Sequence, residues 1–299
     1  MSHHLSARLA GLLSILLLSG CALPSGGPSG VPDRSEGSGG KDVYSVMADV
    51  SSVMADVYSV GVDVSVERKE PVQEQGAEIT AYDFSQPVPE REAVDNSYFA
   101  DAAFVGDSRT DGFMIYSGIG CGENLTSNGI SIFRLGEKKV FKRDGVSYTL
   151  LEALALKEYG KVYLSLGVNE LGVYDDEGFY QAYCDTIDTI RAIQPNAVIY
   201  IQGLIPLNEQ AVADAGGAAY LKNDHLLVYN DLMKKAAQEK QVAFLDLNPV
   251  FADENGQLPE GASRDGVHLK SGPCKQWLEY LKTHTVEFET LYPLEEELV

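Results

Sequence analysis

Four short apolar runs, separated by segments with helical spacing, constrain the fold of this chain most strongly. The runs occupy residues 102–105, 161–166, 197–202 and 242–247. Apolar residues recur at helical spacing over residues 149–159, 176–193, 220–240 and 273–284. Strands that are apolar on both faces and alternate with helices form mostly parallel sheets covered on both sides. The pattern therefore predicts an α/β domain with three layers, α/β/α.

The limits of this domain and its fifth strand follow less directly. A further strand is expected either within residues 129–133 or within residues 139–141, and the sequence does not decide between them. We place the domain at residues 96–290, about 200 residues, which fits a single domain. Residues 291–299 are rich in glutamate and are predicted to be an acidic tail.

The first 20 residues have the pattern of a secretory signal. Arg8 precedes an apolar run from Leu9 to Leu18 that is too short to cross a bilayer as a helix. The sequence Leu18-Ser19-Gly20-Cys21 resembles the lipobox of bacterial lipoproteins, in which the cysteine receives diacylglycerol. The resemblance implies a signal peptide at residues 1–20, lipidation of Cys21 and an anchor on the extracytoplasmic face of the membrane. An ordinary signal peptide with an incidental cysteine is the alternative.

The segment between the signal and the domain, residues 21–95, is predicted to be a disordered tether. Residues 22–40 are mainly Gly, Ser and Pro, and residues 44–64 repeat with a period of seven. The β-branched content and Gly61 argue against a coiled coil. The aspartates of the repeat are too sparse for a calcium loop. We expect no metal and no cofactor.

Charge and cysteine content exclude some partners. The 299 residues carry a formal net charge of −21 at pH 7. Nucleic acid and anionic lipid headgroups would repel such a chain, so any membrane attachment must come from the lipid. Cys121, Cys184 and Cys274 remain beyond the signal, and three cysteines imply no disulfide framework. Cys184 lies on a helical apolar stripe and is predicted to be a core residue.

A serine follows the first apolar run. Gly106-Asp107-Ser108 comes directly after it, and a polar turn is predicted through Gly112. Open α/β sheets place their reactive groups at the carboxyl ends of parallel strands. We therefore predict that Ser108 is a nucleophile, which requires a base to remove its proton.

His268 is the best candidate for that base. It lies in a polar loop between the last predicted strand and the last helix, at the same edge of the sheet as Ser108. Asp265, three residues earlier, can hydrogen-bond one ring nitrogen and leave the other to face the serine. The remaining histidines leave with the signal or lie in predicted helices: His3, His4, His225 and His284.

Ester cleavage also needs hydrogen-bond donors for the developing oxyanion. The candidates are the Ser108 N–H, the Asn169 side chain after the run at 161–166, and the Gly129 N–H. Loss of one such donor costs about 3 kcal/mol of transition-state stabilisation. The alternative for Asn169 and Gly129 is that both are ordinary turn residues.

These residues stand in the order of a known set of sequence blocks. Gly106-Asp107-Ser108, Gly129, Gly167-Val168-Asn169-Glu170 and Asp265-Gly266-Val267-His268 resemble the four blocks of the SGNH, or GDSL-type, hydrolase superfamily. The resemblance covers about residues 96–285. It implies a flavodoxin-like, mostly parallel five-stranded sheet in an α/β/α sandwich. It also implies Ser108 as nucleophile, His268 as base, Asp265 as its orienting acid, and an oxyanion hole of Ser108, Gly129 and Asn169.

Two positions depart from the common family pattern. Arg109 follows the serine where many members have Leu, and Glu170 stands where many have Asp. Arg109 is free to bind a substrate carboxylate or to form an ion pair with Glu170 or Asp111. We favour the ion pair, because the chain is rich in acids that need partners.

Other reaction classes fit less well. An α/β-hydrolase requires Gly-x-Ser-x-Gly, and position 110 is Thr. Cys121 as nucleophile has no adjacent base, and the glycine cluster at 118–122 lacks the lysine of a phosphate-binding loop.

We predict a monomeric serine esterase that removes small acyl groups from cell-wall or other carbohydrate polymers, and acetyl is the acyl group that we favour. The alternatives are a lipase or lysophospholipase, an O-acyltransferase, and a non-catalytic glycan-binding scaffold.

Overall fold

The computed structural model describes residues 81–294, and its centre is a five-stranded parallel sheet with the order β2-β1-β5-β6-β7. The strands are β1 (Ala102–Gly106), β2 (Glu123–Thr126), β5 (Lys161–Ser165), β6 (Val198–Gln202) and β7 (Ala243–Leu245). Every residue of β1, β6 and β7 is buried, as expected for strands that are apolar on both faces. The predicted α/β fold is confirmed.

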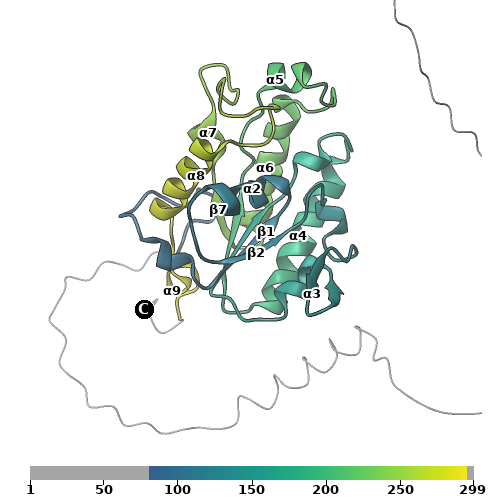
Figure 1. Cartoon of the computed structure of the whole chain (residues 1–299). Helices are drawn as coiled ribbons and strands as arrows, with labels where there is room; N and C mark the ends of the chain where they lie inside the picture. Colours follow the sequence, from purple (N-terminus) through teal and green to yellow (C-terminus); the bar gives the residue numbers. More distant parts are fainter. Residues whose placement is uncertain (1–80, 295–299) are drawn as a thin grey trace, which may run out of the picture. The chain divides into compact units, whose positions relative to one another are not determined.

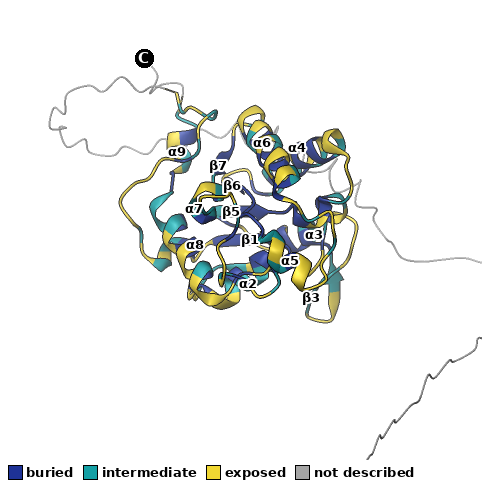
Figure 2. Ribbon diagram, turned by 90° about the horizontal axis from the view of Figure 1, so that it is seen from above, coloured by how far each residue is buried: buried dark blue, intermediate teal, exposed yellow. Residues whose placement is uncertain are grey.

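Helices cover both faces of the sheet (Figure 1). One layer comprises α3 (Leu150–Leu154), α4 (Asp176–Ile193) and α6 (Asn223–Glu239), and the other comprises α2 (Ser108–Tyr116) and α8 (Ser271–Thr283). Figure 2 shows the buried strands between the two layers. The shorter elements are η2 (Asn96–Phe99), η3 (Ile132–Arg134), η4 (Val168–Glu170), α5 (Glu209–Asp214), α7 (Asn248–Phe251), α9 (Phe288–Leu291) and a hairpin of β3 (Phe141–Arg143) and β4 (Val146–Tyr148).

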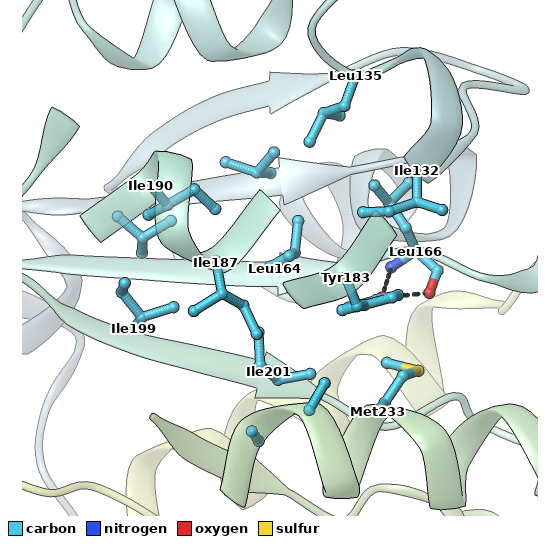
Figure 3. Packing of buried hydrophobic residues seen from close by; sticks show 14 of the residues in the cluster. Ile132, Leu135, Leu164, Leu166, Tyr183, Ile187, Ile190, Ile199, Ile201 and Met233 are labelled. Atoms are coloured by element: carbon cyan, nitrogen blue, oxygen red, sulfur yellow. Dashed lines mark hydrogen bonds between the residues drawn. The ribbon is translucent and has the colours of Figure 1, made fainter. Parts of the chain in front are cut away.

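The hydrophobic core on the α4 side of the sheet also fixes the segment that follows β5. Leu164, Ile199 and Ile201 from the strands pack against Ile187 and Ile190 of α4 (Figure 3). The Tyr183 hydroxyl of the same helix donates to the Leu166 carbonyl at 2.5 Å and accepts from the Leu166 N–H at 3.1 Å. These bonds hold the chain where it leaves β5, directly before Gly167-Val168-Asn169.

The fifth strand lies outside both predicted segments. It is β2, and only Leu125 within it is buried, because β2 is an edge strand that pairs with β1 alone. A strand with one buried residue has no apolar run to reveal it. Residues 129–131 instead form a loop, and Ile132 and Phe133 belong to η3. Phe141 is the first residue of β3, which pairs with β4 in a separate hairpin.

The chain after Ser108 also differs from the prediction. It is the helix α2 and not a turn, because the Asp107 side chain caps it by accepting from the Arg109 N–H at 2.8 Å. The helix predicted at 149–159 is shorter, since α3 ends at Leu154. The segment 176–193 coincides with α4.

The ordered domain extends beyond both predicted limits. Residues 81–95, assigned to the tether, run along the domain: Val88 is 2% exposed and its N–H donates to the Phe244 carbonyl at 2.9 Å. The Arg91 N–H donates to the Thr283 carbonyl at 2.7 Å. At the other end, Leu291 is buried. The signal peptide, Cys21 and the repeats at 44–64 lie outside the described residues.

Candidate active site

The sheet brings the predicted site residues to one edge. Ser108 follows β1, Gly129 lies in the loop after β2, and Asn169 follows β5. The loop with Asp265 and His268 comes after β7 and before α8. Since β2 and β5 flank β1 on opposite sides, the chain changes direction across the sheet at β1. That switch point is where open α/β sheets form their binding crevices.

The turn from β1 into α2 sets the position of Ser108. A Cβ on Gly106 would lie 2.2 Å from Thr110 Oγ1 and 2.7 Å from the Ser165 carbonyl oxygen, so only glycine fits here. Ser108 is the first residue of α2. Its N–H therefore belongs to the group of helix N-terminal donors that have no partner within the helix.

Ser108, His268 and Asp265 form a continuous hydrogen-bonded set. Ser108 Oγ lies 2.9 Å from His268 Nε2, and His268 Nδ1 lies 2.6 Å from Asp265 Oδ2. With the Asp265 carboxylate at Nδ1, the tautomer that carries its proton on Nδ1 is favoured. Nε2 is then free to accept a proton from the serine.

Asp265 is held in its ionised form. Burial raises its pKa, but the hydrogen bonds from the His268 ring and from the N–H groups of His268 and Val267 outweigh that effect. The two N–H groups donate to Oδ1 at 2.8 and 3.0 Å. The pKa of Asp265 therefore lies well below its usual range, and the carboxylate keeps its charge over the working pH range.

The loop from 263 to 269 is braced on both sides. Ser263 and Leu269 form an isolated antiparallel bridge, and Ser263 Oγ lies 2.7 Å from the His268 carbonyl oxygen and 3.1 Å from Asp265 Oδ1. Gly266 has φ +81°, and its carbonyl accepts from the Asn208 N–H at 3.0 Å. Sequence reasoning missed Ser263, which carries no signal beyond its place next to Asp265.

Asn169 reaches the site, but its amide has internal acceptors. Nδ2 donates to Asp107 Oδ2 at 3.1 Å and to the Ile130 carbonyl at 3.0 Å. Asn169 is itself exposed, as is Gly129, whose φ of +69° requires glycine. The Gly129 N–H donates to no backbone acceptor within residues 81–294. The structure thus gathers the three predicted oxyanion donors at one edge.

Two buried carboxylates lie behind Asn169. Burial raises the pKa of Asp107 even though the Arg109 N–H donates to it. Burial likewise raises the pKa of Glu170 to about 7, opposed by a hydrogen bond from the Ile132 N–H and reinforced by the charge of Asp107. Because the Ile132 N–H donates to it, the Glu170 side chain links the segment after β2 to the loop after β5.

The predicted ion pair of Arg109 is wrong. Arg109 is buried, and its guanidinium donates to the Ile205 carbonyl at 2.9 Å instead of pairing with Glu170 or Asp111. Its second amino group has no partner among the described residues, and Arg109 lines a cavity of about 10 Å³, close to the smallest volume that a water needs. Arg109 is therefore a buried residue whose guanidinium is directed to Ile205, although the residue also contributes to the lining of the cavity at Ser108.

The other singled-out residues lie away from the site. His225 packs between Tyr174 and Tyr229, and its ring lies 2.9 Å from the Leu171 carbonyl. Cys184 is a core residue, as predicted. Within residues 81–294 the cysteines are unpaired, no cluster of potential metal ligands occurs, and no helix is long and apolar enough to cross a membrane.

Two adjoining cavities flank His268. The first, the Ser108 cavity, has a volume of about 240 Å³ and is lined by Ser108, Asp111, Ile115, Tyr116, Asn128, His268 and Leu269, among others. The second, the Lys270 cavity, has a volume of about 390 Å³ and is lined by Tyr116, Arg264, Asp265, His268, Leu269, Lys270 and Ser271. Three residues, Tyr116, His268 and Leu269, line both, so the two cavities are neighbours; we call the two together the groove.

Three solved structures are among those to which this chain is similar, and the first of them has the same fold. A protein from Streptococcus pneumonia, provisionally named a platelet activating factor, is 20% identical, with a TM-score of 0.51 over 67% of this chain and 86% of its own. A peptidoglycan O-acetylesterase is 21% identical, with a TM-score of 0.43 over 54% of this chain and 45% of its own. An acetyl xylan esterase is 15% identical, with a TM-score of 0.43 over 62% of this chain and 99% of its own.

The comparison with protein families is the more specific result. Comparison with curated protein sequences finds no match. Residues 104–271, more than half of the chain, match the model of the GDSL-like lipase/acylhydrolase family. The match begins in β1 and ends at the start of α8, and so includes each of the four blocks. The chain therefore belongs to the GDSL-like lipase/acylhydrolase family and is an SGNH-type esterase.

Proposed function

We propose that this protein is a serine esterase that hydrolyses small acyl esters, preferably O-acetyl esters, on carbohydrate polymers. The observation that carries the proposal is the unbroken set Ser108–His268–Asp265, with distances of 2.9 and 2.6 Å. A serine within hydrogen-bond reach of a histidine, which is in turn oriented by a carboxylate, is the arrangement that activates a hydroxyl.

The reaction proceeds in two steps. Ser108 Oγ attacks the acyl carbon while its proton passes to His268 Nε2. The oxyanion accepts hydrogen bonds from the N–H groups of Ser108 and Gly129 and from the Asn169 amide. The C–O bond to the alcohol breaks and His268 returns the proton to the departing oxygen. Water then attacks the acyl-enzyme, His268 takes its proton, and the acid leaves as Ser108 recovers the proton.

The lining of the Ser108 cavity supports a short acyl group. The apolar side chains of this lining are those of Ile115, Tyr116 and Leu269, and the polar ones are those of Ser108, Arg109, Asp111, Asn128 and His268. A long fatty-acyl chain gains about 0.8 kcal/mol for each buried methylene, which requires a longer apolar lining than three side chains. An acetyl group has no such requirement.

The site of action follows from the N-terminal sequence. A lipid on Cys21 and the tether after it would hold the esterase outside the membrane, within reach of cell-wall polymers or imported glycans. Replacement of Cys21 by Ser is expected to move the protein from the membrane fraction to the soluble fraction. Retention of the Cys21→Ser variant in the membrane would contradict a lipid anchor.

The central experiment combines labelling and turnover. A fluorophosphonate probe should label the wild type on Ser108, and Ser108→Ala should abolish the label. Release of 4-nitrophenol from its acetate should fall at least about 10³-fold in Ser108→Ala and His268→Ala. His284→Ala, a histidine stacked on Tyr280 outside the site, serves as the control. A folded wild type that fails to label would favour the glycan-binding scaffold.

Acyl chain length separates the remaining candidates. Esters of two to sixteen carbons should be cleaved with the highest kcat/KM at two to four carbons. A preference for eight carbons or more would replace the acetylesterase by a lipase or lysophospholipase. Acyl groups recovered on an added alcohol and not as free acid would identify an acyltransferase, because the acyl-enzyme is the same.

A further inference from the structure

The groove beside the Ser108–His268 pair is asymmetric in charge. Its Lys270 cavity contains two cations, Arg264 and Lys270, and one carboxylate, Asp265, which is bound to the His268 ring. Its Ser108 cavity contains Asp111, which accepts hydrogen bonds from Asn124 and Thr126. Arg109 also lines this cavity, but it is buried and its guanidinium donates to the Ile205 carbonyl. The exposed positive charge of the groove therefore lies in the Lys270 cavity.

Neither cation has an ion-pair partner. Arg264 and Lys270 are both exposed, and no carboxylate among residues 81–294 pairs with either. In a chain with 44 acidic and 23 basic residues, two such cations beside one histidine leave a local positive potential in an otherwise acidic surface. Salt screens the charges of the rest of the protein at distances beyond about 10 Å. An anion that enters the groove is therefore attracted mainly by these two nearby cations.

The reaction geometry decides which part of the substrate meets these cations. His268 Nε2 returns a proton to the departing oxygen, so the alcohol must lie within hydrogen-bond reach of that nitrogen. The acyl oxygen would accept hydrogen bonds from the N–H groups of Ser108 and Gly129, and neither of these residues lines the Lys270 cavity. The Lys270 cavity is lined by His268 and Asp265 but not by Ser108, so a group that extends from the ester past His268 would enter it. We assign this group to the alcohol part of the substrate.

The exposed aromatic in this groove fits a sugar. Tyr116, at the end of α2, is 52% exposed and lines both cavities. An aromatic ring that stays partly in water offers an apolar face for the C–H side of a pyranose while its hydroxyl remains solvated. A cavity of about 390 Å³ has room for a sugar unit beyond the bond that is cleaved.

We propose that Arg264 and Lys270 bind an anionic group on the alcohol part of the substrate, so that the natural substrate is an O-acylated acidic sugar with a carboxylate near the ester. This inference rests on the proposed esterase function and names its substrate class. Arg264 presents a planar fork suited to a carboxylate, and Lys270 adds a point charge. The two act on binding of the alcohol part and leave the chemistry to Ser108 and His268.

The test compares two substrates that differ only at the carboxyl groups, which are charged in one and neutral in the other. One is an O-acetylated oligogalacturonate, and the other is the same oligosaccharide with its carboxylates methyl-esterified; release of acetate is measured for both. The wild type should prefer the charged form. In Arg264→Gln/Lys270→Gln the ratio of kcat/KM, charged over neutral, should fall about tenfold, with each single variant contributing about threefold. The wild-type ratio should also fall as salt is raised.

The matched control is Lys275→Gln. Lys275 is an exposed lysine of α8, the helix that Lys270 directly precedes. It lines neither cavity and forms no ion pair with a described residue. Its ratio should equal that of the wild type. An equal ratio in the double variant and in Lys275→Gln would overturn the proposal.

Two further results separate this inference from the function beneath it. A wild type that cleaves 4-nitrophenyl acetate but shows no preference between the two oligosaccharides refutes the acidic-sugar site and leaves the esterase intact. Failure to cleave any ester refutes the esterase itself. The wild type could release fatty acid from lysophosphatidylglycerol micelles faster than acetate from either oligosaccharide. Loss of that activity in the double variant would then assign the cations to a lipid phosphate and overturn the acidic-sugar proposal.

Discussion

Asn169 donates one amide hydrogen to Asp107 Oδ2 at 3.1 Å, so the loop after β5 is fixed to the residue that precedes the nucleophile. Its other hydrogen goes to the Ile130 carbonyl at 3.0 Å, next to Gly129. One side chain thus holds the loops after β1, β2 and β5 in a single arrangement. The buried Asp107 carboxylate and the Ile130 carbonyl hold this amide before substrate binds. An oxyanion beside Ser108 would compete with these two acceptors for the amide hydrogens.

Replacement of Asn169 by Ala is expected to lower kcat by about 10²–10³ with a smaller change in KM, because an oxyanion donor acts in the transition state. Asn128→Ala is the matched control: Asn128 lines the same cavity and makes no side-chain hydrogen bond to a described residue. Acetate release from a simple ester measures both. If Asn169→Ala stays within threefold of the wild type, Asn169 only links the three loops and is not an oxyanion donor.

Asp265→Asn should preserve the loop and impair the histidine. The Asn oxygen still accepts from the N–H groups of His268 and Val267, but its amide now faces Nδ1 and favours the wrong tautomer. We expect kcat to fall by about 10²–10⁴ with little change in thermal stability. Asp111→Asn, an acid of the same groove that faces Asn124 and Thr126, controls for the loss of charge. Equal rates in the two variants would remove Asp265 from its role.

The parts of this fold with a local sequence signal were predicted well. β1, β5, β6 and β7 are apolar on both faces, and α4 has a regular apolar stripe, so their spacing alone reveals them. β2 lacks this signal because it is an edge strand with one buried residue. Its place in the sheet depends on pairing with β1, which spacing cannot express.

The polar residues behind the site show the same limit. Arg109 appeared to need an acid, but its partner is the carbonyl of Ile205, 96 positions away in the sequence. Glu170 appeared to be a variant of a family position, but its carboxylate holds the Ile132 N–H across the site. Such partners are set by the packing of distant segments, so a prediction from neighbouring residues selects the wrong one.

Glu170 should make stability depend on pH. The pKa of Glu170 is about 7 in the folded state, above the ordinary value of 4.5. Between pH 4.5 and pH 7, Glu170 is therefore protonated in the folded state and ionised in the unfolded state. Stability then falls as pH rises from about 4.5 to 7 and is constant above, by an amount on the order of 3 kcal/mol. Glu170→Gln cannot titrate and should lack this loss.

Urea unfolding of both proteins at pH 5 and pH 8 measures this effect. The free energy of unfolding of Glu170→Gln, relative to the wild type, should rise by about 3 kcal/mol between the two pH values. This difference is independent of any constant cost of burying the new amide. Glu137→Gln, an exposed glutamate paired with Arg134, should show no such change. Parallel pH profiles for Glu170→Gln and the wild type would show that Glu170 is ionised when folded.

Gly266 should tolerate no side chain. Its φ is +81°, and a Cβ would lie 2.3 Å from the Asn208 carbonyl oxygen and 2.6 Å from the Val212 nitrogen, both backbone atoms that cannot move aside. Gly266→Ala should therefore cost about 2 kcal/mol or more and lower kcat, because the loop carries Asp265 and His268. Gly261→Ala, at φ +83° in open space, bears only the backbone strain, about 1 kcal/mol, and should keep its kcat. Thermal unfolding and acetate release measure both, and equal costs at the two positions would mean that the contact with Asn208 does not position the loop.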